Sequence, residues 1–503
     1  MGMKIKVICL LVICLSGFAL SGQDFVVSDY GIVNDGITKN TETIQSLIDS
    51  VSNLGGGRVV FEKGIYLTGS FNLKSDVELH IKRGATILGS TDFNDHKVLE
   101  GSYQRGLILS SYQKNISITG NGIIDGQGRE AALHVDSLYH NGYEEKIRYN
   151  HVENRPRFYM RPMLISFIGC ENILIQDINL RDAASWVQHY DRCTKLVIEN
   201  ISVYSDAYWN NDGIDISDCR NVKVLNCDIN SADDGICLKS HHEDKLLDSV
   251  YVSNCRVRSS ASAVKFGTKS LGGFRNVTIE NIEVYDTYRS AIAIESVDGG
   301  ILENVIVDGI KAYNTGNAIF IKLGNREPDK GVGTLENVIL RNINVEVAFE
   351  RPDYAYDVRG PALPFFHNTF PASITGMPEH MVNNIILENI NITYPGRGNT
   401  AMAYSPLDRL DSIPENESDY PEFSMFGELP SWAFYVRHVN GLIMKNVNLT
   451  LLEKDYRPAF VFDNVTNLQL ENINIEGKHD QEDLVLKNVA NAKYNPSLFI
   501  LKL

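Results

Sequence analysis

One short pattern, Asn-apolar-x-apolar-x-Asn-apolar or a close variant of it, recurs along most of this chain. Copies that begin with asparagine start at Asn115, Asn172, Asn221, Asn276, Asn304, Asn337, Asn384 and Asn467, and variants start at Lys195, Ser249 and Gly441. From Asn172 to Asn337 the successive copies start 23, 26, 28, 27, 28 and 33 residues apart. Self-similarity at such a nearly constant period is the signature of a repeat protein.

Each repeat contains short segments in which apolar and polar residues alternate, separated by Gly, Asn and Asp. Alternation with period two predicts half-buried strands, and the separating residues predict turns. A unit this small cannot bury its apolar face alone, whereas stacked units form one continuous core. The period is too short for a propeller blade and lacks helical periodicity. We therefore predict an all-β fold, a right-handed parallel β-helix or solenoid, in which asparagines at equivalent turns stack along the axis.

Three regions depart from the repeat. Residues 41–51 read as one amphipathic helix that caps the start of the core. The intervals from Asn337 to Asn384 and from Asn384 to Gly441 are 47 and 57 residues long and contain aromatic- and proline-rich stretches. Long excursions of this kind are usually binding loops. We predict one domain over residues 23–503, with a short capping helix and long late loops.

The first 22 residues predict a signal peptide. Lys4 and Lys6 precede an apolar run from Val7 to Leu20, and small residues follow at Ser21-Gly22. A membrane anchor is the alternative, but about 14 apolar residues are short of the roughly 20 that span a bilayer, and no later run reaches that length. The sequence thus predicts export to the periplasm or the cell exterior and no membrane span.

The formal net charge of −16 makes nucleic acid an improbable partner. It also repels an anionic polysaccharide at long range, so a site for such a substrate must supply its own cations. Six cysteines lie beyond the predicted signal peptide, at Cys170, Cys193, Cys219, Cys227, Cys237 and Cys255. The first three each lie two residues before the start of a repeat, which favours a stack of buried thiols over disulfides. No Cys-x-x-Cys or His-rich spacing indicates a metal site, and no cofactor is expected.

The turns between Lys195 and Ser249 are unusually acidic. WNNDGIDI contains Asp212 and Asp215, and SADDGICLKS contains Asp233 and Asp234. Asp212 and Asp234 are 22 residues apart, about one coil, so stacking brings them close. Carboxyls on neighbouring strands, about 4.8 Å apart, raise one another's proton affinity, so one can stay protonated near neutral pH. This supplies an acid for the leaving oxygen and a base for water, as glycoside hydrolysis requires.

Adjacent residues on a regular strand point to opposite faces. Convergence of Asp233 and Asp234 on one substrate therefore needs a turn or bulge, for which Gly235 is suitable. The alternative is that acidic residues simply favour solenoid turns. For Asp215 we expect a structural role, in which it orients its neighbours.

The ordered set of motifs resembles glycoside hydrolase family 28, the polygalacturonase family of pectin-degrading enzymes. YGIVNDGITKNTETIQSLID from Tyr30, GGGRVVFEKGIYLTGS from Gly55, ITGNGIIDGQG from Ile118 and RPMLISFIGCENILIQDINL from Arg161 are similar to its N-terminal half. WNNDGIDI and ADDGICLKS are similar to its two catalytic motifs. The resemblance implies an inverting hydrolase with Asp233 as general acid, and Asp212 and Asp234 activating the attacking water. Asn210 matches a motif asparagine that shapes the site, and Lys239 matches a basic position after the aspartate pair.

Two elements of the family pattern are missing. Ala261-Ser262-Ala263 stands where the family has Gly-His-Gly, and Phe320-Ile321-Lys322 stands where it has Arg-Ile-Lys. In the family the arginine and the lysine hold a galacturonate carboxylate. Repeat phase predicts a replacement: Asp234, Arg289 and Lys322 each lie 15 residues before the start of a repeat, so we expect the two cations to share a column with Asp234. The alternative is that both are solvated surface charges.

Other residues are weaker candidates for contact with a sugar. Arg326, His241, His242 and Trp186 lie near the motifs, and Trp432 and Tyr435 lie in the late loop segment.

The sequence therefore predicts a glycosidase acting on pectic poly- or oligosaccharide, of galacturonan or rhamnogalacturonan type, with an undefined oligomeric state. A polysaccharide lyase on the same scaffold and a non-catalytic carbohydrate-binding solenoid are the alternatives.

Overall fold

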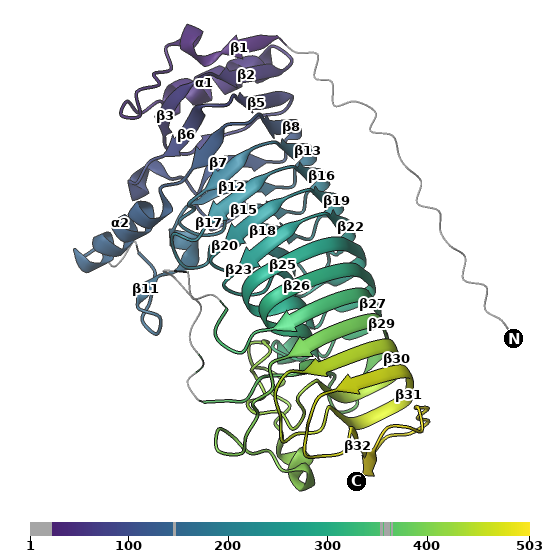
Figure 1. Ribbon diagram of the computed structural model, residues 1–503. Coiled ribbons are helices and arrows are strands. Elements are labelled where there is room, and N and C mark those ends of the chain that lie inside the picture. The colour runs from purple at the N-terminus through teal and green to yellow at the C-terminus, as the bar shows by residue number, and fades with distance from the viewer. Residues whose placement is uncertain (1–22, 144–146, 353–355, 357–362, 364–365) are drawn as a thin grey trace, which may run out of the picture.

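The computed structural model describes residues 23–143, 147–352, 356, 363 and 366–503. The predicted signal peptide lies outside these residues, as does part of the first predicted late loop. The regular elements of the described chain are mostly strands, which form one elongated stack of coils that runs from the purple end to the yellow end of Figure 1. None of the described helices is long and apolar enough to cross a membrane.

The strands of the first coils form three columns, in which each strand pairs in parallel with the strand one coil earlier. The first column contains β1 (Asp24–Val26), β2 (Gly57–Phe61), β5 (Val77–Ile81), β8 (Lys114–Thr119), β13 (Glu171–Gln176), β16 (Thr194–Glu199), β19 (Arg220–Leu225) and β22 (Leu247–Ser253). The second contains β3 (Gly64–Thr68), β6 (Ala85–Gly89), β9 (Ile123–Asp125), β14 (Asn179–Arg181), β17 (Ser202–Ser205), β20 (Asp228–Ser231) and β23 (Arg256–Ser259). The third contains β4 (Phe71–Asn72), β7 (Gly106–Ser111), β12 (Met163–Ile168), β15 (Gln188–Asp191), β18 (Ile214–Ser217), β21 (Ile236–Ser240) and β24 (Val264–Ser270).

In the later coils one long strand often runs through the corners between columns. The long strands are β25 (Gly273–Ser296), β26 (Ile301–Leu323), β27 (Thr334–Val347), β29 (Val382–Tyr394), β30 (Phe434–Leu451) and β31 (Phe460–Glu476). The other strands of these coils are short: β28 (Ala372–Thr375), β32 (Leu484–Lys487) and β33 (Ile500–Lys502). They remain parallel to their neighbours, so the stack continues without interruption to the C-terminal end.

The start of every repeat is a backbone turn. All eleven repeat-starting residues have a positive φ, between 54° and 79°. Asparagine tolerates this left-handed conformation better than other non-glycine residues, because its short polar side chain bonds locally. The side chains also bond from coil to coil, as Asn172 Nδ2 does to Asn115 Oδ1 at 2.7 Å and Asn384 Nδ2 does to Asn337 Oδ1 at 3.1 Å. The predicted stacking of asparagines is confirmed.

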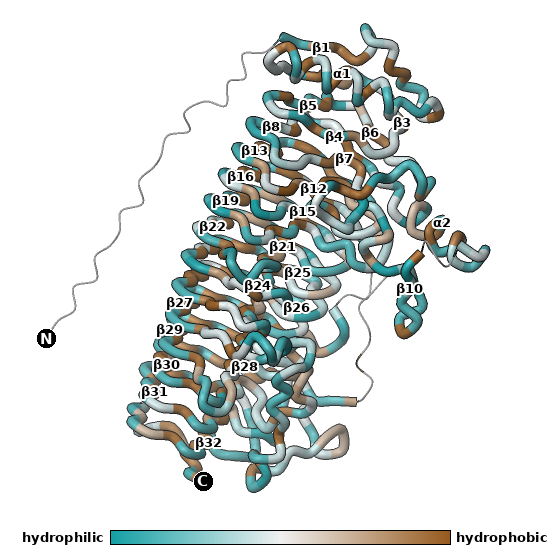
Figure 2. Tube along the Cα trace, turned by 180° about the vertical axis from the view of Figure 1, so that it is seen from behind, coloured by the Kyte–Doolittle hydropathy of each residue, from teal (hydrophilic) through white to brown (hydrophobic). Residues whose placement is uncertain are grey.

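Alternating residues of each strand fill the inside of the stack. In β13, Ile173 and Ile175 are fully buried while Leu174 between them is half-buried. Figure 2 shows the same alternation as brown and teal along the coils. All six cysteines among the described residues are buried and free, and Cys193 N donates to Cys219 Sγ at 3.2 Å. The prediction of stacked thiols in place of disulfides is confirmed.

Two α-helices among the described residues flank the stack. α1 (Thr41–Asn53) covers its first coils with the apolar side chains Ile44, Leu47, Ile48 and Val51, as predicted. α2 (Gly128–His140) was not predicted; it follows β9 in an excursion that also contains the hairpin of β10 (Tyr149–Asn150) and β11 (Arg155–Pro156). The short 3-10 helices are η1 (Val27–Tyr30), η2 (Phe93–Asp95), η3 (Phe158–Met160), η4 (Pro328–Lys330) and η5 (Leu407–Ser412).

The second late loop lies between β29 and β30 and contains no strand. Leu410, Phe423 and Phe426 bury their side chains against Phe320 and Tyr435 of the stack, which attaches the loop along its length. Among the candidates in this region, Trp432 and Tyr435 were expected to line a binding site. That expectation is wrong, because the two side chains are 1% and 0% exposed in the packed interior. The two aromatic side chains contribute to the packed hydrophobic core instead.

Candidate active site

Asp212 and Asp234 occupy the same position on successive coils. Each lies two residues before a third-column strand, and β18 and β21 pair in parallel with Ile214 opposite Ile236. As a result, a carboxylate oxygen of Asp212 lies within 4.8 Å of one of Asp234. The prediction that Asp212 and Asp234 lie one coil apart is confirmed.

Asp233 reaches the same cleft because the chain bends just before β21. Ser231 Oγ and Ser259 Oγ donate to the Asp233 carbonyl at 2.8 and 2.6 Å and hold the bend. Gly235 is required there, since a Cβ on it would lie 2.4 Å from Val257 Cγ1. The predicted turn is therefore present. A glycine is needed in it because the next coil packs too closely to leave room for a side chain.

The three carboxyls line one cleft of about 600 Å³ on the side of the stack. Asn210 and Lys239 line it too, as do Trp186, His189, Asp191, Arg192, His241, His242, Lys269, Arg326 and Tyr420. Of the residues that the sequence singled out, the structure thus gathers Asn210, Asp212, Asp233, Asp234 and Lys239 in one place. The weaker candidates Arg326, His241, His242 and Trp186 also face this cleft.

Asn210 is held from behind by a buried arginine. Arg161, which is 0% exposed, donates to Asn210 Oδ1 at 2.7 Å and to the carbonyls of Ala184 and Trp209 at 2.7 and 2.6 Å. Asn210 Nδ2 then points to Asp233 Oδ2 at 3.4 Å. Arg161 therefore fixes which end of the Asn210 amide faces the acid.

Lys239 bridges two aspartates. Its Nζ donates to Asp212 Oδ2 at 3.1 Å and to Asp215 Oδ1. The Nζ also lies 4.6 Å from the centre of the Trp186 ring. Asp215 is fully buried, which agrees with the structural role expected of it, and burial raises its pKa to about 6 although Lys239 opposes the shift.

The three cleft carboxyls have different proton affinities. Burial raises the pKa of Asp212 well above its ordinary 3.8, and the charge of Asp215 raises it further. Burial likewise raises the pKa of Asp233, with a contribution from the charge of Asp234. Burial acts in the same direction on Asp234, but the cations of Lys265, Lys239 and Arg289 outweigh it and lower the pKa of Asp234 below 3.8. Asp233 is thus suited to carry a proton while Asp234 is ionised.

Arg289 does not share a column with Asp234. In the register of the paired strands β21, β24 and β25, Arg289 lies level with Asp233, one residue before the position level with Asp234. Its Nε lies 2.9 Å from Glu422 Oε2 of the late loop, and it does not line the cleft. The column prediction failed because it measured phase from the start of the next repeat, and the coils are not of equal length beyond Asp234.

Lys322 lies still further from the predicted column. It pairs with Glu295, while Asn317 is the residue of β26 level with Asp234, so Lys322 lies five positions along the coil. It is 1% exposed, and its Nζ donates to the Glu415 carbonyl of the late loop at 3.1 Å. Burial lowers the pKa of Lys322 to about 8. Lys322 therefore does not share the column with Asp234 that repeat phase predicted.

The cation that does reach Asp234 was missed. Lys265, the second residue of β24, places its Nζ 3.2 Å from Asp234 Oδ2. It pairs through Ala293 with Phe320, the residue that stands where the resemblance expected an arginine. Phe266 faces the core, so strand alternation places its neighbour Lys265 on the outward face. A lysine at an outward position two coils before Phe320 was therefore the sequence signal that could have identified this cation.

Among the residues that the structure describes, two groups of side chains bring metal-binding atoms within 4.8 Å of one another: Asp212, Asp234 and Cys237, and Asp191, Asp218 and His242. In the first, Lys239 and Lys265 already supply positive charge. In the second, Arg192 lies 2.8 Å from Asp191, and Asp218 accepts from Ser240 Oγ at 2.7 Å. Protein cations and donors thus already contact the carboxylates of both groups.

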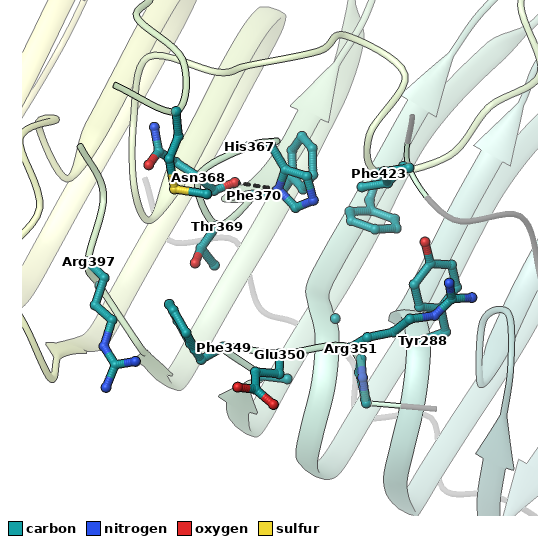
Figure 3. Close-up of a pocket in the computed structure, with 16 residues that line it drawn as sticks. Tyr288, Phe349, Glu350, Arg351, His367, Asn368, Thr369, Phe370, Arg397 and Phe423 are labelled. Carbon is teal, nitrogen blue, oxygen red and sulfur yellow. Dashed lines mark hydrogen bonds between the residues drawn. The ribbon is translucent and has the colours of Figure 1, made fainter. Parts of the chain in front are cut away.

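A second cavity of about 260 Å³ lies further along the stack (Figure 3). Tyr288, Phe370 and Phe423 form an aromatic wall, and Arg351 lies over the Tyr288 ring at 4.3 Å. The residues next to this wall, Arg289 and Glu422, form the ion pair described above. The two cavities share no lining residue and are distinct.

The fold and the site together define a class of protein: a stack of parallel coils whose lateral cleft carries neighbouring carboxyls, the groups that glycoside hydrolysis uses. The sequence matches the profile of glycosyl hydrolases family 28 over residues 58–350. This chain belongs to that family.

Relatives of the chain carry pectin-related names. A "Probable polygalacturonase" of Vitis vinifera is 28% identical over 313 residues, which are 59% of this chain and 56% of that protein. The "Exo-poly-alpha-D-galacturonosidase" of Dickeya chrysanthemi is 22% identical over 72% of this chain and 71% of that protein. The match thus spans little more than half of the Vitis protein. The family 28 exopolygalacturonase structure from Yersinia enterocolitica, 20% identical, covers 94% of this chain and 78% of its own with a TM-score of 0.58, which supports the fold.

Proposed function

We propose that this chain hydrolyses glycosidic bonds in pectic poly- or oligosaccharides, of galacturonan or rhamnogalacturonan type, with inversion and by general acid–base catalysis. Family membership and the names of the relatives support this class of substrate. One observation carries the mechanism: Asp233 and Asp234 line one cleft, and their pKa values are shifted in opposite directions.

In this mechanism Asp233 protonates the leaving glycosidic oxygen. Asn210 Nδ2, at 3.4 Å, orients the carboxyl toward the cleft. Asp234, which is ionised, takes a proton from the attacking water, and Asp212 beside it holds that water. Lys239 contacts both Asp212 and Asp215, so its ammonium offsets the negative charge of these two carboxylates. An inverting enzyme needs this division of roles because the acid and the base act on opposite faces of the sugar.

For Arg289 and Lys322 we propose an indirect role in substrate binding, through the late loop that they contact. The stacked coils are proposed to wind as a right-handed β-helix, as is usual for parallel crossovers, within a single domain over residues 23–503. Export to the periplasm or the cell exterior is proposed on the apolar N-terminal sequence. No cofactor is part of the proposal.

A panel of pectic oligosaccharides, with products identified by mass and the new anomer by NMR, tests the function. Asp233→Asn and Asp234→Asn should each lower kcat by about 10²- to 10⁴-fold with folding intact, because each removes one proton transfer. Asp228→Asn, at an exposed position of β20 in the same coil but outside the lining of the cleft, is the control. Substantial turnover by both variants would overturn the roles. An unsaturated, ultraviolet-absorbing product that a chelator abolishes would indicate a lyase instead.

A further inference from the structure

Residues 413–423 of the late loop, here called the docking segment, cross several coils beside the cleft. Polar contacts attach them to the stack. Arg437 Nη1 donates to Ile413 O at 2.8 Å, Lys322 Nζ to Glu415 O at 3.1 Å, Asn325 N to Glu417 O at 2.7 Å and Lys265 Nζ to Tyr420 Oη at 3.0 Å, while Arg289 pairs with Glu422 at 2.9 Å. The contacts come from β24, β25, β26, the residues just after β26, and β30, so the segment spans the stack at this level. Tyr420 is the member of the segment that lines the cleft.

Lys265 connects this segment to the carboxyls. Its ammonium lies 3.2 Å from Asp234 Oδ2 and 3.0 Å from Tyr420 Oη, and the side chain is 1% exposed. The other oxygen of Asp234 accepts from Ser262 N at 3.0 Å. Each oxygen of Asp234 therefore has a donor, one from a rigid backbone and one from a lysine that Tyr420 holds.

The position of Lys265 differs from that of Lys239. Lys239 serves the Asp212–Asp215 pair, whereas the contacts of Lys265 are with Asp234 and Tyr420. A lysine is costly to bury unless it is paired, so the Asp234–Lys265 pair needs both partners. Desolvation around Lys265 also strengthens its effect on the carboxylate, because screening by water is lost.

We propose that Lys265 is a positioning residue, which fixes the carboxylate of Asp234 and keeps it ionised, and that Tyr420 of the docking segment holds the Lys265 ammonium in place. The inference rests on the proposed function, since it assigns Asp234 the role of base. It makes the late loop a part of the catalytic apparatus through one side chain. It also gives the site a cation where the motif arginine is missing.

The test compares Lys265→Met with Lys265→Arg in pH profiles of kcat/KM. An opposite charge nearby lowers a carboxyl pKa by about 1 to 3 units, so loss of the ammonium in Lys265→Met should move the acidic limb up by about 1 unit or more. kcat should fall with KM nearly unchanged, and Lys265→Arg should restore the limb. Tyr420→Phe should move it in the same direction by less. Lys445→Met, which removes an exposed partner of Glu388 far from the cleft, is the control. An acidic limb that stays in place in folded Lys265→Met would overturn the proposal.

A second measurement does not depend on turnover. If Lys265→Met fails to fold, the double variant Asp234→Asn/Lys265→Met should regain much of the lost melting temperature, because the unpaired carboxylate is then neutral. If the double variant is as unstable as the sum of the single changes, the pair does not exist and the proposal fails. If wild type cleaves no pectic substrate while the double variant is rescued, the proposed function fails and the Asp234–Lys265 pair stands.

Discussion

Asp233 and Asp234 are neighbours in sequence, yet their carboxyls have different surroundings. Asp233 accepts from Asp234 N at 2.9 Å and from the neutral amide of Asn210, whereas Asp234 has the Lys265 ammonium at 3.2 Å. A cation at contact distance favours the ionised form far more than an amide does. The division of labour between acid and base is therefore built by partners from other coils, which the local sequence DD does not contain.

These shifts predict a bell-shaped pH profile of kcat/KM for the free enzyme. Asp234, with its pKa below 3.8, is ionised above that value, so the acidic limb should lie below pH 3.8. Asp233, with its pKa raised, keeps its proton above pH 3.8, so the alkaline limb should lie higher. Asp233→Asn should remove the alkaline limb together with most of the activity. An acidic limb that lies above pH 3.8 would contradict the assignment.

Glu295 gives a prediction for stability against pH. Burial, with the charge of Asp234, raises its pKa to about 8 although Lys265 opposes the shift. The folded state thus holds a proton that the unfolded state, with a pKa near 4.5, releases. Stability should fall as pH rises from about 4.5 to about 8. Glu295→Gln, which stays neutral, should gain melting temperature over wild type progressively across that range.

The control for this measurement is Glu346→Gln, at an exposed position on β27. Its melting temperature should follow that of wild type at every pH. A constant difference between Glu295→Gln and wild type from pH 4.5 to pH 8 would show that the Glu295 proton is not linked to folding.

At the scale of the element, the turn asparagines combine two roles that substitution can separate. Asn389 has a φ of 55°, donates to Asn342 Oδ1 at 3.0 Å and accepts from Asn446 Nδ2 at 2.9 Å. Asn389→Gly keeps the backbone conformation and loses both side-chain bonds, at about 0.5–1.5 kcal/mol each. Asn389→Ala should cost a further 1–2 kcal/mol or so for the left-handed backbone. The free energy of unfolding from chemical denaturation should therefore be highest for wild type, lower for Asn389→Gly and lowest for Asn389→Ala. An Ala variant as stable as the Gly variant would show that the left-handed backbone conformation makes no contribution.

The same elements indicate what the sequence could predict. Asn or Gly at most repeat starts, and alternation within each strand, are local properties, so the stack and its turns were predictable. The distance between Asp212 and Asp234 followed because 22 residues make one coil there. The alignment of Arg289 with Asp233 could not be predicted from the repeat, because one residue more or less in a corner moves every later side chain by one position along the coil. Lys265 was missed because its partners, Asp234 and Tyr420, are 31 and 155 residues away.

The whole molecule is a long stack with a single-sided cleft, and its late loop returns to the acids. Lys265, Arg289 and Lys322 come from successive strands β24 to β26, and all three contact the docking segment. Two of them were predicted to bind a substrate carboxylate. The structure assigns these cations to the loop, and such long-range pairing cannot be read from a repeat pattern because the loop lies outside the repeat.

Net charge sets the last prediction. The chain carries a formal charge of −16, and several cations of the cleft are paired with acids, Arg326 with Asp298 at 2.8 Å and Lys269 with Glu327 at 2.6 Å. The field met by a distant polyanion is therefore repulsive. Salt reduces the range of this field from about 30 Å at 0.01 M to about 8 Å at 0.15 M. We expect kcat/KM for polygalacturonate to rise over that range of NaCl concentration.

A fully methyl-esterified pectic oligosaccharide is the matched substrate, since it has the same backbone without the carboxylates. If it is cleaved, its kcat/KM should change little with salt, because neither long-range repulsion nor local pairing acts on a neutral chain. A fall in kcat/KM for polygalacturonate with added salt would mean that attraction by Arg192, Lys269 and Arg326 inside the cleft outweighs the repulsion outside it. Comparing the two substrates thus separates the field of the whole molecule from the charges of the site.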